Sequence, residues 1–433
     1  VAVTVYAGGL VFQQVFGIKE LWGIDFFWIA AIGLVVLTAL YTIFGGMKSV
    51  LYTSVLQTPI LLLGSLIILV LGFKELGGWD EMMRVCGAVT VNDYGDTMTN
   101  LIRSNDDANF PWLGALIGSA IIGFWYWCTD QFIVQRVLSG KNEMEARRGT
   151  IFGAYLKLLP VFLFLIPGMI AFALHQKYIG AGGEGFLPML ANGTANADAA
   201  FPTLVAKLLP VGVKGLVVCG ILAALMSSLA SLFNSSAMLF TIDFYKRFRP
   251  ETPEKKLVGI GQVATVVIVI LGILWIPIMR SVGDVLYTYL QDVQSVLAPG
   301  IAAAFLLGIC WKRTSAQGGM WGLIAGMVIG LTRLGAKVYY SNAGEVADST
   351  FKYLFYDMNW LFFCGWMFLF CIIVVIVVSL ATKAPTAEKI QGLVFGTATK
   401  EQKAATRASW NHWDIIHTVI ILAITGAFYW YFW

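Results

Sequence analysis

Residues 123–136 read Gly-Phe-Trp-Tyr-Trp-Cys-Thr-Asp-Gln-Phe-Ile-Val-Gln-Arg, so three consecutive aromatic side chains stand just before a Thr-Asp-Gln segment. The stretch ends an apolar run that begins near residue 112 and is long enough for a membrane helix. Asp130 and Gln131 would be costly against lipid, and we therefore expect them to face protein or water. Aromatic rings stack on the apolar faces of sugars, which makes a binding site one interpretation. An interfacial aromatic belt followed by polar loop residues is the alternative.

The composition of the whole chain also indicates a membrane protein. The chain has 433 residues, of which 58% are hydrophobic and 12% are charged, and its formal net charge is +4. Soluble domains average about 25% charged residues, and a soluble fold of this length would lack the charges to cover its surface. The basic residues are too few and too scattered for a nucleic-acid-binding stripe. No phosphate-binding loop, HExxH or GxSxG motif occurs in the sequence. We therefore predict an all-α polytopic membrane protein that is not an enzyme, with no organic cofactor and no nucleic-acid partner.

Apolar runs of about 20 residues predict about eleven transmembrane helices. Pro160, Pro167 and Pro277 fall inside these runs and are expected to kink the helices rather than end them. The predicted spans are 1–18, 26–44, 53–73, 112–134, 151–175, 213–241, 257–280, 285–311, 318–337, 360–382 and 414–433.

The charges between the spans predict an orientation. One alternating set of loops is richer in Lys and Arg, above all the loops 135–148 and 246–256, while the long loop 74–111 of the other set carries acids. By the positive-inside rule the basic set is cytoplasmic. This places the Val1 end inside and the Trp433 end outside. Because Val1 stands directly in an apolar stretch without an initiator Met, we expect a fragment whose upstream part is missing.

Two polar features inside the spans leave their roles open. Lys157 lies six residues into the fifth span. It either has a functional role inside the membrane or extends its ammonium group back to the cytoplasmic interface. Gln291 and Asp292 stand near the start of the eighth span, where they either face a polar cavity or mark the beginning of the helix.

The stretch 223–236 combines small residues with several hydroxyls. Ala224 and Ser228 are four residues apart, so a backbone carbonyl and a hydroxyl fall on one helix face. Hard oxygen ligands of this kind suit a small cation. A small-residue face for close helix packing is the alternative interpretation.

Residues 125–131, followed by Val134-Gln135-Arg136, resemble the sodium/glucose cotransporter branch of the sodium/solute symporter family. Other stretches along the whole chain carry the same resemblance. They are Ala39–Gly46, Tyr155–Leu158, Phe201–Val205, Ser227–Leu229, Phe233–Ser235, Phe240–Tyr245 and Trp311–Arg313 with the glycine-rich span after it.

The resemblance implies a leucine-transporter-type fold, with two inverted five-helix repeats whose first helices are broken at the midplane. It places span 1–18 at the third core helix and span 112–134 at the broken sixth. Residues 1–311 would then form a partial core holding core helices 3–10, with the first two core helices upstream. Residues 312–433 would add three helices outside the core.

The resemblance also implies site residues. The sugar-binding set consists of Trp125, Tyr126, Trp127, Gln131, Lys157 and Gln291. The sodium ligands are the Ala224 carbonyl and the Ser227 and Ser228 hydroxyls.

Four positions refine these expectations. Ser54 stands where relatives often carry Asp, and Ala230 stands where two-sodium relatives carry Thr, which together favour one sodium per sugar. Gly123 replaces a polar sugar-contact residue, which leaves the preferred sugar open. Gln291 is retained, which disfavours the sugar-sensor variant that carries an acid there.

The expected function is sodium-coupled symport of a hexose, glucose or galactose, by alternating access. The alternatives are a symporter for myo-inositol, another polyol or a sialic acid, or a sugar-gated conductance or sensor. The expected partners are the hexose, the sodium ion as coupling ion and the lipid bilayer, in a bacterial inner membrane.

Overall fold

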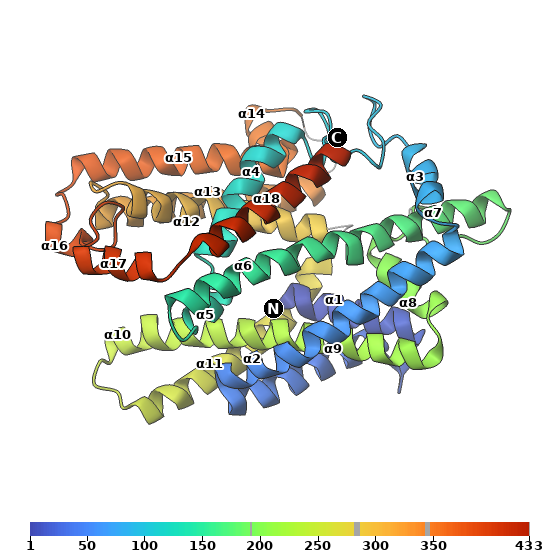
Figure 1. Cartoon of the computed structure of the whole chain (residues 1–433), viewed down its shortest axis with the longest axis horizontal. Helices are drawn as coiled ribbons and strands as arrows, with labels where there is room; N and C mark the ends of the chain where they lie inside the picture. Colours follow the sequence, from blue (N-terminus) through green and yellow to red (C-terminus); the bar gives the residue numbers. More distant parts are fainter. Residues whose placement is uncertain (191–192, 281–285, 343–346, 433) are drawn as a thin grey trace. The chain divides into compact units, whose positions relative to one another are not determined.

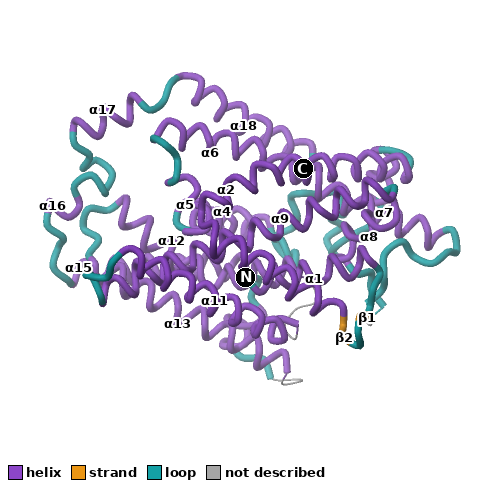
Figure 2. The backbone as a smooth tube through the Cα atoms, turned by 90° about the horizontal axis from the view of Figure 1, so that it is seen from below, coloured by secondary structure: helices purple, strands orange, loops and turns teal. Residues whose placement is uncertain are grey.

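The backbone is helical along nearly its whole length (Figures 1 and 2). The computed structural model describes residues 1–190, 193–280, 286–342 and 347–432, and for 44–50, 278–280, 286–289 and 342 it describes the backbone alone. The strands in these residues form one short hairpin, β1 (Glu20–Leu21) and β2 (Ile24–Asp25), which pair antiparallel. Trp22 and Gly23 join them, both with positive φ, as a tight two-residue hairpin turn requires.

In the described residues, the helices that could cross a membrane correspond to ten of the eleven predicted spans. In the described residues nine helical segments are long and apolar enough, and a bent pair adds a tenth. The segment at the first predicted span, α1 (Ala2–Phe16), is shorter, at 15 residues. The second and third spans, Phe26–Ile43 and Leu51–Leu76, belong to one long helical element, α2 (Phe26–Leu76). The predicted all-α polytopic class is confirmed.

The chain divides into two compact units, which we describe separately. Unit 1 comprises residues 1–90, 97–99 and 156–286. Besides α1, α2 and the hairpin it contains α3 (Trp79–Gly87), η1 (Val161–Leu165), α7 (Ile166–Gly180), η2 (Ala197–Ala199), α8 (Ala200–Leu208), α9 (Val211–Met238), η3 (Leu239–Tyr245), α10 (Lys246–Phe248) and α11 (Glu254–Arg280).

Unit 2 comprises residues 91–96, 100–155 and 287–433. The helix α6 (Glu143–Pro160) begins in unit 2 and ends in unit 1. Unit 2 further contains α4 (Trp112–Cys128), α5 (Gln131–Leu138), α12 (Leu286–Cys310), α13 (Ala316–Asn342), α14 (Thr350–Lys352), η4 (Tyr353–Asp357), α15 (Trp360–Ala381), α16 (Ala387–Ile390), α17 (Lys400–Ala408) and α18 (His412–Tyr431). This division follows contacts in space, whereas the expected border after residue 311 follows helix order and stays a prediction.

The prolines lie inside helical segments without ending the spans, as predicted. After Pro160 the backbone widens into the π-helical turn η1 and then continues as α7, so that one helical segment runs from Glu143 to Gly180. A proline lacks the N–H that an α-helical turn needs, and a wider turn accommodates the missing bond. Pro277 likewise lies inside α11.

Close packing in unit 1 relies on small residues between α2 and α9. A Cβ on Gly64 would come within 2.7 Å of Val217, and one on Gly220 would come within 3.2 Å of Ile60. These contacts precede the stretch 223–236, so small-residue packing stays an alternative interpretation for that stretch. In unit 2, glycines four residues apart on α13 allow close approach to α12 and α15.

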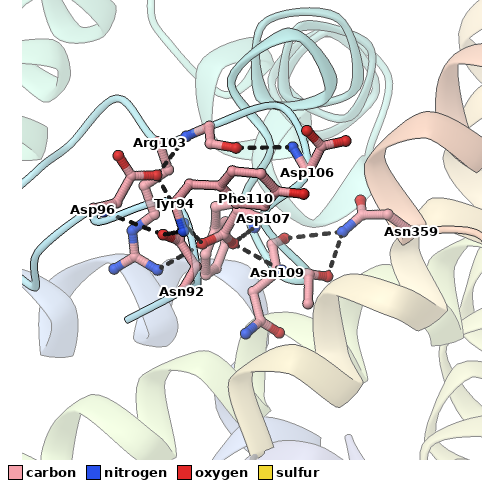
Figure 3. A network of polar contacts seen from close by, with 11 residues as sticks. Asn92, Tyr94, Asp96, Arg103, Asp106, Asp107, Asn109, Phe110 and Asn359 are labelled. Atoms are coloured by element: carbon pink, nitrogen blue, oxygen red, sulfur yellow. Dashed lines mark hydrogen bonds and ion pairs between the residues drawn. The ribbon is translucent and has the colours of Figure 1, made fainter. Parts of the chain in front are cut away.

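The loop before α4 is held by a polar network around two aspartates (Figure 3). Asp107 accepts hydrogen bonds from the backbone N–H groups of Asn109 (2.9 Å) and Phe110 (2.7 Å), and Arg103 lies 3.5 Å from its other oxygen. Asp96 accepts from the Asn92 side chain at 2.7 Å and from the backbone N–H of Ser104 at 2.6 Å. The network joins residues 92–96 to residues 103–110, directly before α4 in unit 2.

Candidate functional site

The predicted span 112–134 is broken inside the quoted stretch. The helices α4 and α5 meet at an angle of 47°, with Thr129 and Asp130 between them. The Thr129 hydroxyl and the N–H groups of Thr129 and Asp130 all donate to the Trp125 carbonyl, at 2.7, 3.0 and 3.1 Å. The Asp130 carboxylate then caps α5 by accepting from the N–H of Phe132 at 3.0 Å. Asp130 therefore has a local structural role that explains its place in the span.

The three aromatic side chains lie directly before this break. Tyr126 is half-buried and stacks edge-on against Trp127, with ring centroids 5.3 Å apart. Trp125 lies 6.2 Å from Tyr126 and packs on the core cluster that contains Ile121 and Ile122. Trp127 is 48% exposed. Tyr126 and Trp125 are thus partly buried in unit 2, whereas Trp127 is exposed.

The predicted polar members of the sugar set fall in both units. Gln131 is the first residue of α5 and Gln291 lies in the second turn of α12, and both are partly buried in unit 2. Lys157 lies on α6 in unit 1 and is exposed. The side chains of 287–289, which belong to the same predicted polar stretch as Gln291, lie outside the described residues.

The predicted sodium ligands share one face of α9. Ala224, Ser227 and Ser228 are partly buried and fall within about one helical turn. The described residues contain no group of three or more His, Cys, Asp or Glu side chains suited to a metal ion. The three predicted ligands on this face are neutral oxygens, one backbone carbonyl and two hydroxyls.

A second helix brings further oxygens to this face. The Ser54 hydroxyl, on α2, lies 2.6 Å from the Ser227 hydroxyl. The Tyr41 hydroxyl, also on α2, donates to the Met226 carbonyl at 2.9 Å. Sequence reasoning named Ser54 only as a departure from a pattern, and it missed Tyr41. Neither contact could be found from spacing, because the partners are more than 170 residues apart.

The serines of α9 use their hydroxyls differently. Ser231 donates to the Ser227 carbonyl at 3.0 Å, and Ser235 donates to the Leu232 carbonyl at 3.1 Å, so both are satisfied by their own helix. The Ser228 hydroxyl makes no side-chain hydrogen bond to any residue that the structure describes. The Ser228 hydroxyl oxygen has two lone pairs for a cation, as do those of Ser231 and Ser235, whose hydrogen bonds use only the hydroxyl proton.

A buried ion cluster lies one residue from Gln291. The Asp292 carboxylate pairs with the Lys337 ammonium at 2.5 Å and with the Arg333 guanidinium at 3.6 Å. Arg333 is 1% exposed, donates to the Met358 carbonyl at 2.8 Å and lies 4.0 Å above the Phe363 ring. These contacts were in neither of the two interpretations left open for Asp292, a polar cavity or a helix start. Instead, the carboxylate joins α12 to α13.

The sequence comparisons agree on the family. The model described as "Sodium:solute symporter family" matches residues 1–326. A sodium/mannose cotransporter from Bos taurus is 34% identical over all of this chain and 75% of its own length. Sodium/myo-inositol cotransporter 2 from Homo sapiens is 35% identical, over 92% of this chain and 59% of its own length. Sodium/glucose cotransporter 1 from Ovis aries is 38% identical, over 83% of this chain and 57% of its own length. The chain thus spans less than two thirds of two of these three relatives.

A solved structure shares the fold. A Na⁺-coupled sialic acid symporter, solved in a substrate-bound outward-open state, superposes with a TM-score of 0.65. The match covers 88% of this chain and 73% of that structure, at 21% sequence identity. At this identity the likeness bears on the fold alone, and it agrees with the expected leucine-transporter-type arrangement.

Proposed function

This chain belongs to the sodium:solute symporter family, whose members are transporters rather than enzymes, and from that premise we propose that it performs sodium-coupled symport of a neutral hexose such as glucose or galactose. The observation that carries the proposal is the pair of oxygen-rich faces of α2 and α9 in one unit, where Ser54 and Ser227 meet. The broken span with its partly buried Tyr126 supplies the second element that symport needs.

The sodium ion is proposed to bind at the α9 face. The Ala224 carbonyl and the Ser227 and Ser228 hydroxyls would supply hard, uncharged oxygen ligands. One sodium per sugar fits this face, because Ala230, which is fully buried, offers no hydroxyl for a second ion. The Ser54 hydroxyl supports the geometry of Ser227 without adding a charge.

The sugar is proposed to bind at the break between α4 and α5. The Tyr126 ring, partly buried beside Trp125, offers an apolar face for a pyranose and a hydroxyl for its polar edge. Gln131 and Gln291 of unit 2 are proposed to hydrogen-bond the sugar hydroxyls, and Trp127 to border the site. The predicted sugar contact of Lys157, which lies in unit 1, stays a prediction.

A cyclic polyol such as myo-inositol is the second candidate substrate. Relatives named for mannose, myo-inositol and glucose match at similar identity, from 34% to 38%. All three are neutral rings with several hydroxyls, so the proposed aromatic and amide contacts suit each of them.

Transport then follows from differential affinity. Sodium entering down its gradient and the membrane potential, which is worth about 2.3 kcal/mol per charge per 100 mV, would stabilise the outward-facing state. Sugar binding would complete an occluded state closed by Tyr126, and both ligands would leave on the other side. Each ligand must bind one state better than the other for this coupling to occur.

The experiment uses the full-length protein in proteoliposomes with an inward sodium gradient. Labelled glucose, galactose, mannose and myo-inositol are tested separately, with potassium replacing sodium in a parallel series. Accumulation above equilibrium only with sodium supports symport, and the ranking of the four solutes names the substrate. Equal uptake in both salts, or a sugar-evoked current without accumulation, would overturn the proposal in favour of facilitation or sensing.

Matched serine variants test the ion site. Ser228→Ala should raise the sodium concentration for half-maximal uptake at least tenfold, since it removes a direct ligand. Ser235→Ala removes a hydroxyl from the same helix that is already bonded to Leu232, and it should leave the sodium dependence unchanged. Equal behaviour of the two variants would reject the assigned ligand.

We also propose the cell membrane as its location, with the Val1 end cytoplasmic and the Trp433 end extracytoplasmic. The basic loops 135–148 and 246–256 support this orientation. Cysteine labelling from one side of sealed cells at positions 141 and 106, placed in predicted opposite loops, would test it.

A further inference from the structure

A cavity of about 410 Å³ lies between α6 and α18 in unit 2, and its lining residues are different from those assigned to sugar or sodium. Its size is in the roughly 300–1,000 Å³ range of small-molecule sites. In both views the two helices run beside each other (Figures 1 and 2). The walls are formed by Arg148, Phe152 and Tyr155 of α6 and by Trp413, Asp414 and His417 of α18.

The cavity sits where the membrane meets water. Glu143–Gly180 and His412–Tyr431 are both candidate spans, and the wall residues lie in the second to fourth turns of the first and in the first two turns of the second. Arg148 is five residues from the start of its span, which is about 8 Å along the helix. Head groups of the bilayer occupy this level, where Trp and Tyr side chains also collect.

Two opposite charges face the cavity and do not fully satisfy each other. The Nε of Arg148 is 3.9 Å from Oδ1 of Asp414, and the Arg148 side chain is 48% exposed. Oδ2 of Asp414 accepts from the N–H of Asn411 at 2.8 Å in the cap of α18, which fixes the carboxylate. The neighbouring Arg147 instead donates to Ser409 at 3.2 Å and is engaged by the protein. The cavity thus presents a guanidinium and a carboxylate oxygen side by side.

We propose that this cavity binds the head group of a phospholipid that carries both a phosphate and a primary ammonium group. The exposed edge of the Arg148 guanidinium would take the phosphate through paired hydrogen bonds. Oδ1 of Asp414 would accept from the ammonium, and the face of Trp413, which is 55% exposed, would add a cation–π contact. A purely anionic head group would leave the carboxylate facing a phosphate without compensation.

The surroundings suit the rest of such a lipid. Phe152, on the α6 wall, is 63% exposed, and Ile420 and Ile424, which follow on the cavity side of α18, are 40% and 42% exposed. These apolar side chains continue from the cavity into the span, where acyl chains lie. The ammonium group, the phosphate and the acyl chains of such a lipid would therefore each meet a surface of matching chemistry.

The test measures lipid affinity of the purified full-length protein by native mass spectrometry. Phosphatidylethanolamine, phosphatidylcholine and phosphatidylglycerol with identical chains are titrated, and soluble phosphoethanolamine is the competitor. We expect phosphatidylethanolamine to bind about tenfold more tightly than the other two, with little competition by the soluble head group. Arg148→Gln should weaken phosphatidylethanolamine binding about tenfold, whereas Arg247→Gln, which removes an exposed charge elsewhere, should not.

A second variant tests the charge of Asp414 while keeping the cap of α18. Asp414→Asn keeps an acceptor for the cap of α18 but removes the carboxylate charge, so it should abolish the preference for phosphatidylethanolamine while phosphatidylglycerol binding persists. Unchanged preference in Asp414→Asn, or unchanged affinity in Arg148→Gln, would overturn the proposal. Equal binding of soluble phosphoethanolamine would also overturn it, in favour of a soluble ligand.

Discussion

The hydroxyl oxygens of Ser54 and Ser227 lie 2.6 Å apart, although the two residues are separated by 173 positions in the chain. Ser54 comes from α2 and Ser227 from α9, and the two helices pack closely through their small residues. Position 54 therefore directly adjoins the proposed sodium face, and its side chain sets the charge next to that face.

Replacing Ser54 by Asp should strengthen sodium binding. A carboxylate within about 4 Å of a cation contributes up to about 4 kcal/mol in a medium of intermediate polarity, part of which is lost to desolvation. We expect the sodium concentration for half-maximal uptake to fall about tenfold, whereas Ser54→Ala should change it little. The measurement is sodium-dependent sugar uptake in proteoliposomes. An unchanged sodium dependence in Ser54→Asp would separate position 54 from the ion site.

Replacing Gly123 by Ser should change sugar preference without harming the fold. A Cβ at Gly123 meets no atom within 4 Å, so the added hydroxymethyl group has room near the aromatic stretch. A new hydrogen bond is worth about 1 kcal/mol, which corresponds to about a fivefold change in relative affinity between two sugars. Competition by galactose, glucose and myo-inositol measures the change. Gly153→Ser, at another open glycine, is the control and should leave the ranking as it is.

Removing the charge of Asp292 should destabilise unit 2. The Asp292→Asn variant would leave Lys337 and the fully buried Arg333 without their anion, and loss of one partner of a buried pair costs about 3–5 kcal/mol. Thermal unfolding of the purified protein should show a clearly lower midpoint. The double variant Asp292→Asn with Lys337→Met removes one of the stranded cations and should recover part of the loss. A double variant less stable than the single one would contradict this account.

The loop before α4 should loosen only in strong acid. Burial alone would raise the pKa of Asp107, but the N–H groups of Phe110 and Asn109, together with Arg103 and Asn92, outweigh it and hold the pKa below its ordinary value. A carboxyl whose pKa is lowered by folding stabilises the fold above its unfolded pKa, which is about 3.9, and loses this contribution as the pH falls through the folded pKa. Protection of the Asn109 and Phe110 amides from hydrogen exchange, corrected for intrinsic rates, should therefore be flat from pH 5 to 8 and drop below about pH 4.

An Asp107→Ala variant provides the comparison for this pH profile. Its amides should be poorly protected at every pH, since the acceptor oxygens are gone. A wild-type profile that already declines between pH 6 and 7 would point to a different titrating group.

The sequence alone determined the class of the protein and the positions of its spans. A membrane helix needs about 20 apolar residues in a row, and this requirement is local, so residues 360–382 or 257–280 could be identified without any partner. The break near Thr129 also left a local signal, because polar residues interrupt an apolar run there. The resemblance of residues 125–131 to a family was likewise readable from the sequence.

Only the tertiary structure decided which polar groups meet. Asp292 was equally compatible with a cavity or a helix start until α13 brought Lys337 and Arg333 to it. The contact of Ser54 with Ser227 depends on the packing of α2 against α9, and the cavity beside Arg148 depends on where α18 lies along α6. Helix periodicity fixes the face on which a residue stands, but the facing partner is chosen by long-range packing, which no spacing along the chain encodes.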